Sequence, residues 1–185
     1  MSDDGTTSAG KRCHSDELAR ILSHSWSDPT ATLLVFSVRP AVSCELYVER
    51  LRALISAAVM IARDVNFDDD SEIALDSLPE WFRVMSDAVS AEGSSNYLIA
   101  DLGDIWDPAE WIYCFDPDLR AWTWWDVTVR ADGVAVWIDT LGEPHVPHGE
   151  LLWALYVSGA DRVDLPYAED AAVWVDETDI ESGPD

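Results

Sequence analysis

The chain has 185 residues, which is enough for one domain with a sizeable core and short for two. Its formal net charge is -25, because 36 carboxylates face 11 basic residues, of which only Lys11 is a lysine. Such a surface repels nucleic acid and anionic lipid, and it attracts basic proteins over a long range. The 48% apolar content and ten tryptophans exclude a wholly disordered acidic chain.

The apolar runs and the cysteines of the sequence indicate the protein's location and the state of its thiols. The longest apolar run, residues 54–62, is too short to cross a bilayer, and no signal-peptide pattern opens the sequence, so we expect a cytoplasmic protein. Cys13, Cys44 and Cys114 are odd in number and widely spaced, which predicts reduced thiols. Solubility, a halophile's surface or a GC-rich coding bias would explain the acidity without any partner.

The pattern along the chain predicts one domain between two flexible ends. Residues 1–14 lack hydrophobic periodicity and are expected to form a flexible leader. A single α+β domain is expected over residues 15–176, followed by an acidic flexible tail over residues 177–185. The domain should hold an antiparallel sheet around residues 109–140, packed with two to four helices.

The N-terminal half predicts a strand between helices. A short helix is expected over residues 15–22. The apolar run Thr32 to Val38 stops before a proline and predicts a buried strand. Ser43 is a suitable N-cap for a helix to Arg63, whose apolar residues recur at helical spacing.

The middle of the chain predicts a helix and two strands. The Ser-x-x-Glu pattern of residues 77–80 predicts a capping box, opening a helix with a shared apolar face. That face would hold Leu78, Phe82, Met85 and Val89. Gly93 to Asn96 should end the helix, and strands are expected over Tyr97 to Asp101 and Trp111 to Phe115.

The C-terminal third predicts a hairpin, a helix and an edge strand. Asp132-Gly133 lies between alternating apolar runs, which is typical of a two-residue type I′ hairpin turn. A helix over residues 149–158 should end at Gly159, and residues 172–175 are expected to form an edge strand.

The expected turn sorts the side chains of the hairpin onto two faces. Val127 would face Ile138 on an aliphatic side that also takes Trp125, and Asp126 would lie opposite Asp139 on the other side. That second side would be aromatic, with Trp111, Tyr113, Phe115, Trp122, Trp124 and Trp137. Either the helices over residues 43–63 and 149–158 cover this face, or it is partly open for binding. Facing carboxylates would need a cation between them, either Arg130 or a partner's side chain.

Motifs for chemistry are weak. An EF-hand that starts at Asp64 would place Asp69 where glycine is needed and Leu75 where glutamate is needed. His145 and His148 offer zinc donors together with Glu143 and Glu150, but the prolines at 144 and 147 forbid a regular helix there. Nucleophile-elbow and phosphate-loop motifs are also missing, so we expect no enzyme, cofactor or metal.

One stretch resembles a known group of proteins. Residues 137–163, WIDTLGEPHVPHGELLWALYVSGADRV, place a strand ending Ile-Asp-Thr-x-Gly-x-Pro before a helix closed by Ser-Gly-Ala. This is similar to small acidic immunity proteins of actinobacterial polymorphic-toxin systems, over about a seventh of the chain. The resemblance implies a non-enzymatic, cytoplasmic α+β protein that binds and blocks one toxin, and it assigns no functional residue.

Charge and resemblance together predict an inhibitor of a basic toxin, either a nuclease or a deaminase. The expected partner contacts are acidic and aromatic: Asp68, Asp69, Asp70, Glu72, Asp104, Trp106, Asp107, Glu110, Trp122, Trp124, Asp126, Trp137 and Asp139. One alternative is a nucleic-acid mimic that sequesters DNA-binding proteins. Another is a metal-dependent hydrolase, which would lose activity on a change of Asp68 or His148.

Overall fold

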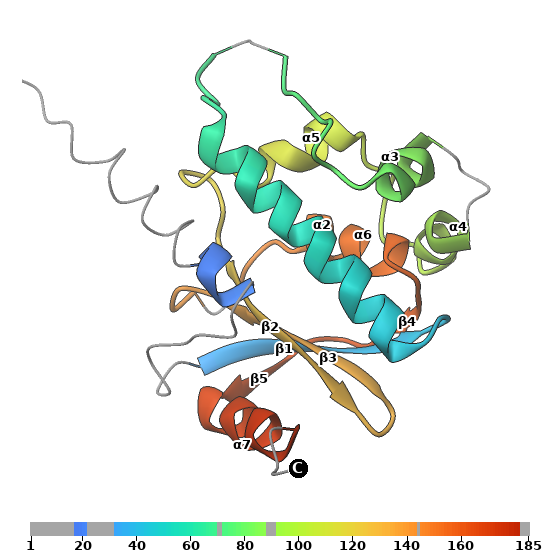
Figure 1. Ribbon diagram of the computed structural model, residues 1–185, viewed down its shortest axis with the longest axis vertical. Coiled ribbons are helices and arrows are strands. Elements are labelled where there is room, and N and C mark those ends of the chain that lie inside the picture. The colour runs from blue at the N-terminus through green and yellow to red at the C-terminus, as the bar shows by residue number, and fades with distance from the viewer. Residues whose placement is uncertain (1–16, 22–31, 70–71, 88–91, 144, 182–185) are drawn as a thin grey trace, which may run out of the picture.

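The computed structural model describes residues 17–21, 32–69, 72–87, 92–143 and 145–181. An open five-stranded antiparallel sheet carries helices on both faces, so the predicted α+β class is confirmed (Figure 1). The strands are β1 (Thr32–Pro40), β2 (Thr123–Arg130), β3 (Gly133–Asp139), β4 (Ala160–Val163) and β5 (Tyr167–Asp170). The helices are α2 (Cys44–Asp64), α3 (Glu80–Asp87), α4 (Glu92–Ile99), α5 (Pro108–Tyr113), α6 (Gly149–Val157) and α7 (Ala171–Glu181), and residues 17–21 are also helical. The described helices are therefore more numerous than the two to four expected.

Strand β1 is the centre of the sheet. The strand order is β2-β3-β1-β4. Strands β4 and β5 pair with the same side of β1: β5 with its first half and β4 with its last residues. Phe36 and Val38 belong to a large apolar cluster, whereas Leu33 and Val35 belong to a small one. Because side chains alternate along a strand, the two clusters lie on opposite faces of the sheet.

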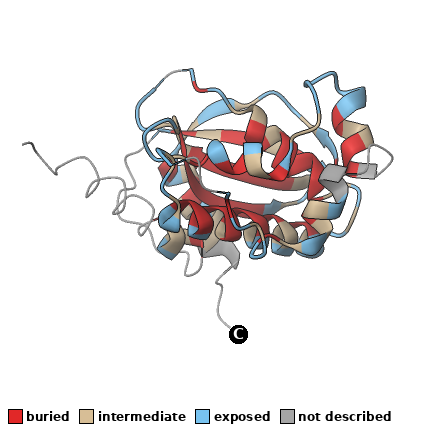
Figure 2. Cartoon of the chain, turned by 90° about the horizontal axis from the view of Figure 1, so that it is seen from above, coloured by how far each residue is buried: buried red, intermediate tan, exposed pale blue. Residues whose placement is uncertain are grey.

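Helix α2 covers the face with the large cluster and confirms the clearest sequence prediction. The Ser43 side chain accepts a hydrogen bond from the Leu46 amide at 3.3 Å, as an N-cap should. The buried side of α2 includes Tyr47, whose hydroxyl donates to the Leu155 carbonyl of α6 at 3.2 Å. Figure 2 shows that buried residues concentrate in the strands and on the inward sides of the helices.

The predicted hairpin is present, but its turn and its faces differ from the prediction. Arg130 pairs with Gly133, so Ala131 and Asp132 form the turn, and Val127 faces Val136 rather than Ile138. A β-bulge at Trp125 then shifts the register between Trp124 and Asp126. An extra residue reverses the side-chain alternation, so Trp124 joins the large cluster and Trp125 the small one.

Three predicted strands are wrong, since their residues are helical. Trp111 to Phe115 begins within α5, because Asp107 caps that helix and Pro108 takes its first position. Tyr97 to Asp101 begins within α4, which also contains the predicted stop at Gly93 to Asn96. Residues 172–175 lie in α7.

Other predictions are met in part or fall outside the described residues. Helix α3 begins at Glu80 rather than directly after Ser77, although Leu78 and Phe82 are buried as expected. The described residues do not include the Met85 side chain, Val89, residues 1–16 or residues 182–185, while residues 177–181 of the expected tail continue α7. Helix α6 ends before Gly159, which has a φ of +116°. Within the described part of the chain, no helix is both long and apolar enough to cross a membrane.

Candidate functional site

The tryptophans of the predicted aromatic face are sealed inside the protein. Trp122, Trp124 and Trp137 are each 0% exposed, so the alternative of an open binding face is wrong. Trp122 and Trp124 belong to the large cluster with residues of α2 and α6, whereas Trp137 belongs to the small cluster with Trp174 of α7. These three residues cannot contact a partner of the folded protein, because the chain's own helices cover them.

Asp126 is equally buried and has partners within the chain. Its Oδ1 accepts from Arg52 Nη2 of α2 at 3.0 Å, and its Oδ2 accepts from Trp174 Nε1 of α7 at 3.0 Å. The bulge places Asp126 opposite Trp137, so the predicted opposition to Asp139 is wrong. Asp139 pairs with Thr123 instead, and its carboxylate accepts from the Leu141 amide at 2.8 Å.

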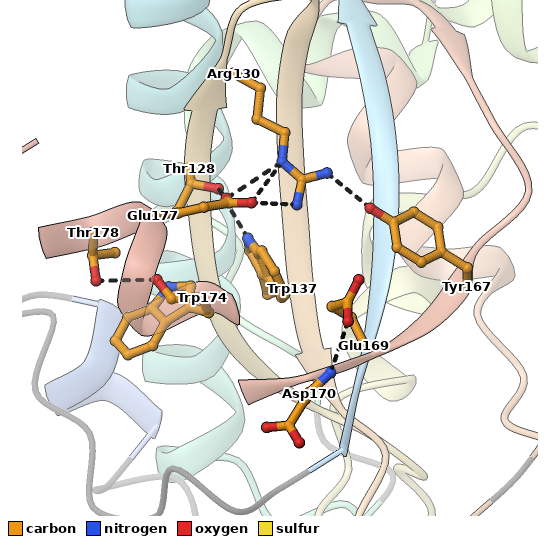
Figure 3. Close-up of polar contacts among 9 residues, drawn as sticks. All are labelled: Thr128, Arg130, Trp137, Tyr167, Glu169, Asp170, Trp174, Glu177 and Thr178. Carbon is orange, nitrogen blue, oxygen red and sulfur yellow. Dashed lines mark hydrogen bonds and ion pairs between the residues drawn. The ribbon is translucent and has the colours of Figure 1, made fainter. Parts of the chain in front are cut away.

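Arg130, the expected cation between two aspartates, instead anchors helix α7 (Figure 3). Its guanidinium lies 2.6 Å from Glu177 Oε1 and donates to the Tyr167 hydroxyl at 2.8 Å. Thr128 donates to Glu177 at 2.9 Å and accepts from Trp137 Nε1 at 2.9 Å. This network ties α7 to the hairpin, so we assign these side chains a structural role.

The negative charge is distributed unevenly along the chain. Residues 64–118 carry 15 carboxylates and one basic residue, whereas the other 130 residues carry 21 carboxylates and ten basic residues. We call the described part of residues 64–118 the acidic cap. It comprises α3, α4, α5 and their connecting loops, and it lies on the same side of the sheet as α2, with α4 next to α6 and β4 (Figure 1). Outside the cap, Arg52, Arg120, Arg130 and Arg162 are each held in an ion pair.

Two of the predicted contact regions meet in the acidic cap. The loop after α2 exposes Asp68 and Asp69, and Glu72 is exposed beyond Asp70, which lies outside the described residues. The Phe67 ring packs edge-on against the Tyr113 ring of α5, with the ring centroids 5.6 Å apart. This contact holds the loop against the helix that follows the second region.

In the second region, only some of the predicted contacts are free to meet a partner. Asp107 caps α5 by accepting from the amides of Ala109 and Glu110 at 2.8 and 3.2 Å. Trp106 is half-buried and donates to the Tyr97 hydroxyl at 3.4 Å. The pKa of Tyr97 is raised, mainly by burial. The hydrogen bond from Trp106 acts in the opposite direction, and the charge of Asp104 adds to the increase. Asp104 and Glu110 are exposed.

The acidic cap also exposes apolar side chains that the sequence analysis did not identify. Ile99 is 82% exposed, and Val84, Leu98 and Leu102 are exposed as well. Tyr97, Leu98 and Ile99 are consecutive apolar residues, which cannot all share one face of a helix. Since Tyr97 is buried, the other two must point outward, and a helical assignment of this segment would have revealed them.

A cavity of about 440 Å³ opens between the end of α2 and the segment that precedes α3. We call it the cap pocket. Its apolar lining includes Met60, Ile61 and Ile73, and its carboxylates are those of Asp64, Asp69 and Glu72. A pocket with this lining has the residue types to hold a long side chain with a positively charged end.

The potential metal and thiol sites have little support. Among the described residues, no group of three or more His, Cys, Asp or Glu side chains is placed to hold a metal ion. His148 Nδ1 lies 2.8 Å from the Val146 carbonyl, and its ring packs edge-on against Phe36. Cys44 and Cys114 are free thiols, and burial, with smaller contributions from Glu150 and Glu110, raises the pKa of Cys114 to about 11.

The comparisons with known proteins identify no relative. No family model matches the chain, and no curated protein or solved structure is significantly similar to it.

Proposed function

We propose that this protein is a non-enzymatic inhibitor, an immunity protein that neutralises a basic toxin such as a nuclease or deaminase. It would bind through the acidic cap and occlude the toxin's active or substrate-binding site. Carboxylates would occupy the places where the toxin otherwise receives the phosphates of its substrate.

One observation supports this proposal most directly, namely the concentration of carboxylates in the acidic cap with a single arginine among them. Acidity for solubility alone predicts an even distribution of charge over the exterior. A field concentrated on one side steers a basic partner toward that side and speeds association. The exposed apolar residues of α3 and α4 add surface that a partner would bury, and such burial slows dissociation.

The acidic cap also fits the alternative of a nucleic-acid mimic. The two functions differ in selectivity, because a mimic would bind many DNA-binding proteins whereas an inhibitor would bind one toxin. The exposed Val84, Leu98, Ile99 and Leu102 favour the inhibitor, since a DNA surface presents phosphates and offers no aliphatic groups of this kind to imitate.

The test takes as the candidate toxin the C-terminal domain of a large secreted protein encoded immediately upstream, and it measures binding of the full chain to that domain. The cap variant, Asp69→Asn with Glu72→Gln and Asp104→Asn, removes three exposed carboxylates. We expect its association rate to fall about tenfold at low ionic strength, because steering raises association rates by roughly 10 to 10³. Stopped-flow tryptophan fluorescence in low and high salt would measure this rate.

A matched control variant removes the same number of charges elsewhere. Asp132→Asn with Asp161→Asn and Asp176→Asn changes three exposed carboxylates outside the cap. Its association rate should stay within about twofold of the unmodified chain. Equal losses in both variants, or no binding at low salt, would contradict the proposal, and equally tight binding to unrelated DNA-binding proteins would favour the mimic.

A further inference from the structure

We infer that the cap pocket binds an arginine side chain of the partner protein. This inference rests on the proposed function and adds to it the chemical group that the partner must insert. Two properties of the pocket support this inference, namely its apolar floor and its carboxylate rim.

The floor of the cap pocket leaves apolar surface without cover. Met60 belongs to α2 and is 44% exposed, although Ala58, two residues earlier on the same helix, is fully buried. Ile61 and Ile73 are almost buried, and both line the cavity. The volume of about 440 Å³ lies within the range of roughly 300–1,000 Å³ that is typical of binding pockets. The methylene groups of a long side chain would bury this surface.

The rim carries negative charge that the described residues do not neutralise. Asp69 and Glu72 are exposed and form no ion pair within the described part of the chain. Asp64 is paired with Arg63 at 3.1 Å, but both side chains are largely exposed to solvent. Exposed pairs of this kind contribute at most about 1 kcal/mol, so Asp64 remains available to an incoming cation.

Arginine fits this combination better than the other cations that proteins meet. Its guanidinium donates two parallel hydrogen bonds to a carboxylate while its aliphatic stem packs on apolar surface. Lysine has a strongly hydrated point charge and lacks the planar fork. A hard metal ion needs six or more oxygen ligands, which a floor of methionine and isoleucine does not supply.

The test uses the full chain and needs no partner. The sequence contains three methionines, Met1, Met60 and Met85, so ¹³C-methyl labelling gives three signals. The variant Met60→Leu assigns the pocket signal. N-acetyl-arginine-methylamide is then titrated in, beside its citrulline analogue, which has nearly the same shape without the charge, and its lysine analogue.

The inference predicts that the arginine probe moves the Met60 signal saturably in the millimolar range and leaves Met1 and Met85 in place. The citrulline probe should have no effect, and the lysine probe should bind several-fold more weakly. The variant Asp69→Asn with Glu72→Gln should weaken arginine binding about tenfold, while Asp132→Asn with Asp161→Asn should leave it unchanged.

Three results would overturn the inference: an unmoved Met60 signal, an equal response to citrulline, or an equal response to lysine. Its failure can be distinguished from failure of the proposed function. If the arginine probe does not bind but the cap variant still loses affinity for the toxin domain, the inhibitor proposal stands without this pocket. If neither binds, both proposals are lost.

Discussion

At the scale of single residues, the buried carboxylates and the exposed ones have different roles. Glu17 is fully buried, pairs with Arg120 at 2.8 Å and accepts from the Trp124 amide. Glu150 is nearly buried and accepts from Trp122 Nε1 at 2.6 Å. Buried charges persist only when they are paired or hydrogen-bonded, so these carboxylates belong to the fold. Only the exposed carboxylates can serve a partner.

Asp126 provides a test of this structural role. Replacement by alanine would remove the carboxylate that accepts from Arg52 and from the Trp174 indole, although Arg52 still donates to the Val127 carbonyl. Breaking a buried pair costs about 3 kcal/mol or more. We expect Asp126→Ala to lower the free energy of unfolding by about 3 kcal/mol, measured by urea denaturation. Asp161→Asn, an exposed control, should change it by less than about 0.5 kcal/mol. A loss of similar size in both variants would contradict the assignment.

Cys114 gives a prediction about pH. Its pKa of about 11 in the folded chain lies above the ordinary value of 9.0, mainly because of burial. In a chain with Cys13→Ser and Cys44→Ser, alkylation by iodoacetamide at pH 8 should be about a hundredfold slower when folded than in urea. The rate should rise with pH up to about 11.

The raised pKa of Cys114 also makes the free energy of unfolding depend on pH. The folded state holds the Cys114 proton more tightly than the unfolded state does. The protonated thiol therefore contributes in full to the free energy of unfolding below pH 9.0, and this contribution disappears as the pH rises through about 11. Removal of the thiol by Cys114→Ser should abolish this part of the alkaline loss of stability. A folded thiol that reacts as fast as the unfolded one would refute the prediction.

At the scale of helices and strands, an element is predictable from the sequence where a long periodic pattern determines it. Helix α2 spans 21 residues with a continuous apolar side, and β1 is an unbroken apolar run. Short apolar runs failed, since WIYCF and AVWV fit a buried strand and a buried helix equally well. The Asp107-Pro108 start of α5 was the available signal, because an aspartate N-cap with proline next to it favours a helix.

The candidate site was only partly predictable for a related reason. The acidic residues that the structure describes in the two loops are exposed, because runs of like charge remain in solvent. Trp124 was expected on the face opposite Val127 rather than in the same cluster, because a register deduced from the turn cannot include a bulge. The bulge at Trp125 places its ring against Trp174 of α7, a segment whose sequence pattern predicts a strand.

The edge of the sheet formed by β2 is protected by side chains. On the edge strand β2, the Trp124 amide donates to Glu17, the Trp124 carbonyl accepts from Arg20 at 3.2 Å, and the Val127 carbonyl accepts from Arg52 at 3.1 Å. Charged side chains that occupy edge groups prevent a further strand from pairing there. A strand of a partner would therefore not pair with β2.

Helix α7 can be tested as a structural cover. Trp174 is 2% exposed and packs edge-on against Trp125, and its indole donates to Asp126. We expect Trp174→Ala to lower the free energy of unfolding by about 3 to 5 kcal/mol, through the cavity and the lost hydrogen bond. Trp174→Phe keeps an aromatic ring and should cost less. If both variants are as stable as the parent, α7 does not cover the sheet in solution.

At the scale of the whole molecule, the basic residues are separated in sequence from a large share of the carboxylates. The sheet and the helices around it hold most of the paired arginines, whereas the acidic cap holds carboxylates with little opposite charge. Crowded like charges destabilise a compact state by mutual repulsion. The arrangement therefore has a cost in stability, and a concentrated field for partner binding is the compensation that we propose.

The cost predicts an unusual response to salt. The Debye length falls from about 30 Å at 0.01 M to about 8 Å at 0.15 M ionic strength, so added salt should screen repulsion within the acidic cap. We expect the melting temperature to rise by about 5 °C over this range, since 1 kcal/mol corresponds to roughly 2–4 °C in a chain of this size. Circular dichroism at increasing NaCl concentrations measures the melting temperature.

The cap variant should be more stable than the parent at low salt and gain less from salt, because three repelling charges are gone. The control variant with Asp132→Asn, Asp161→Asn and Asp176→Asn removes the same charge from less crowded surroundings and should gain less stability. If the two variants respond identically, the repulsion is a property of the net charge and not of the cap. If the melting temperature of the parent falls with salt, attractive ion pairs outweigh the repulsion and the predicted cost in stability does not exist.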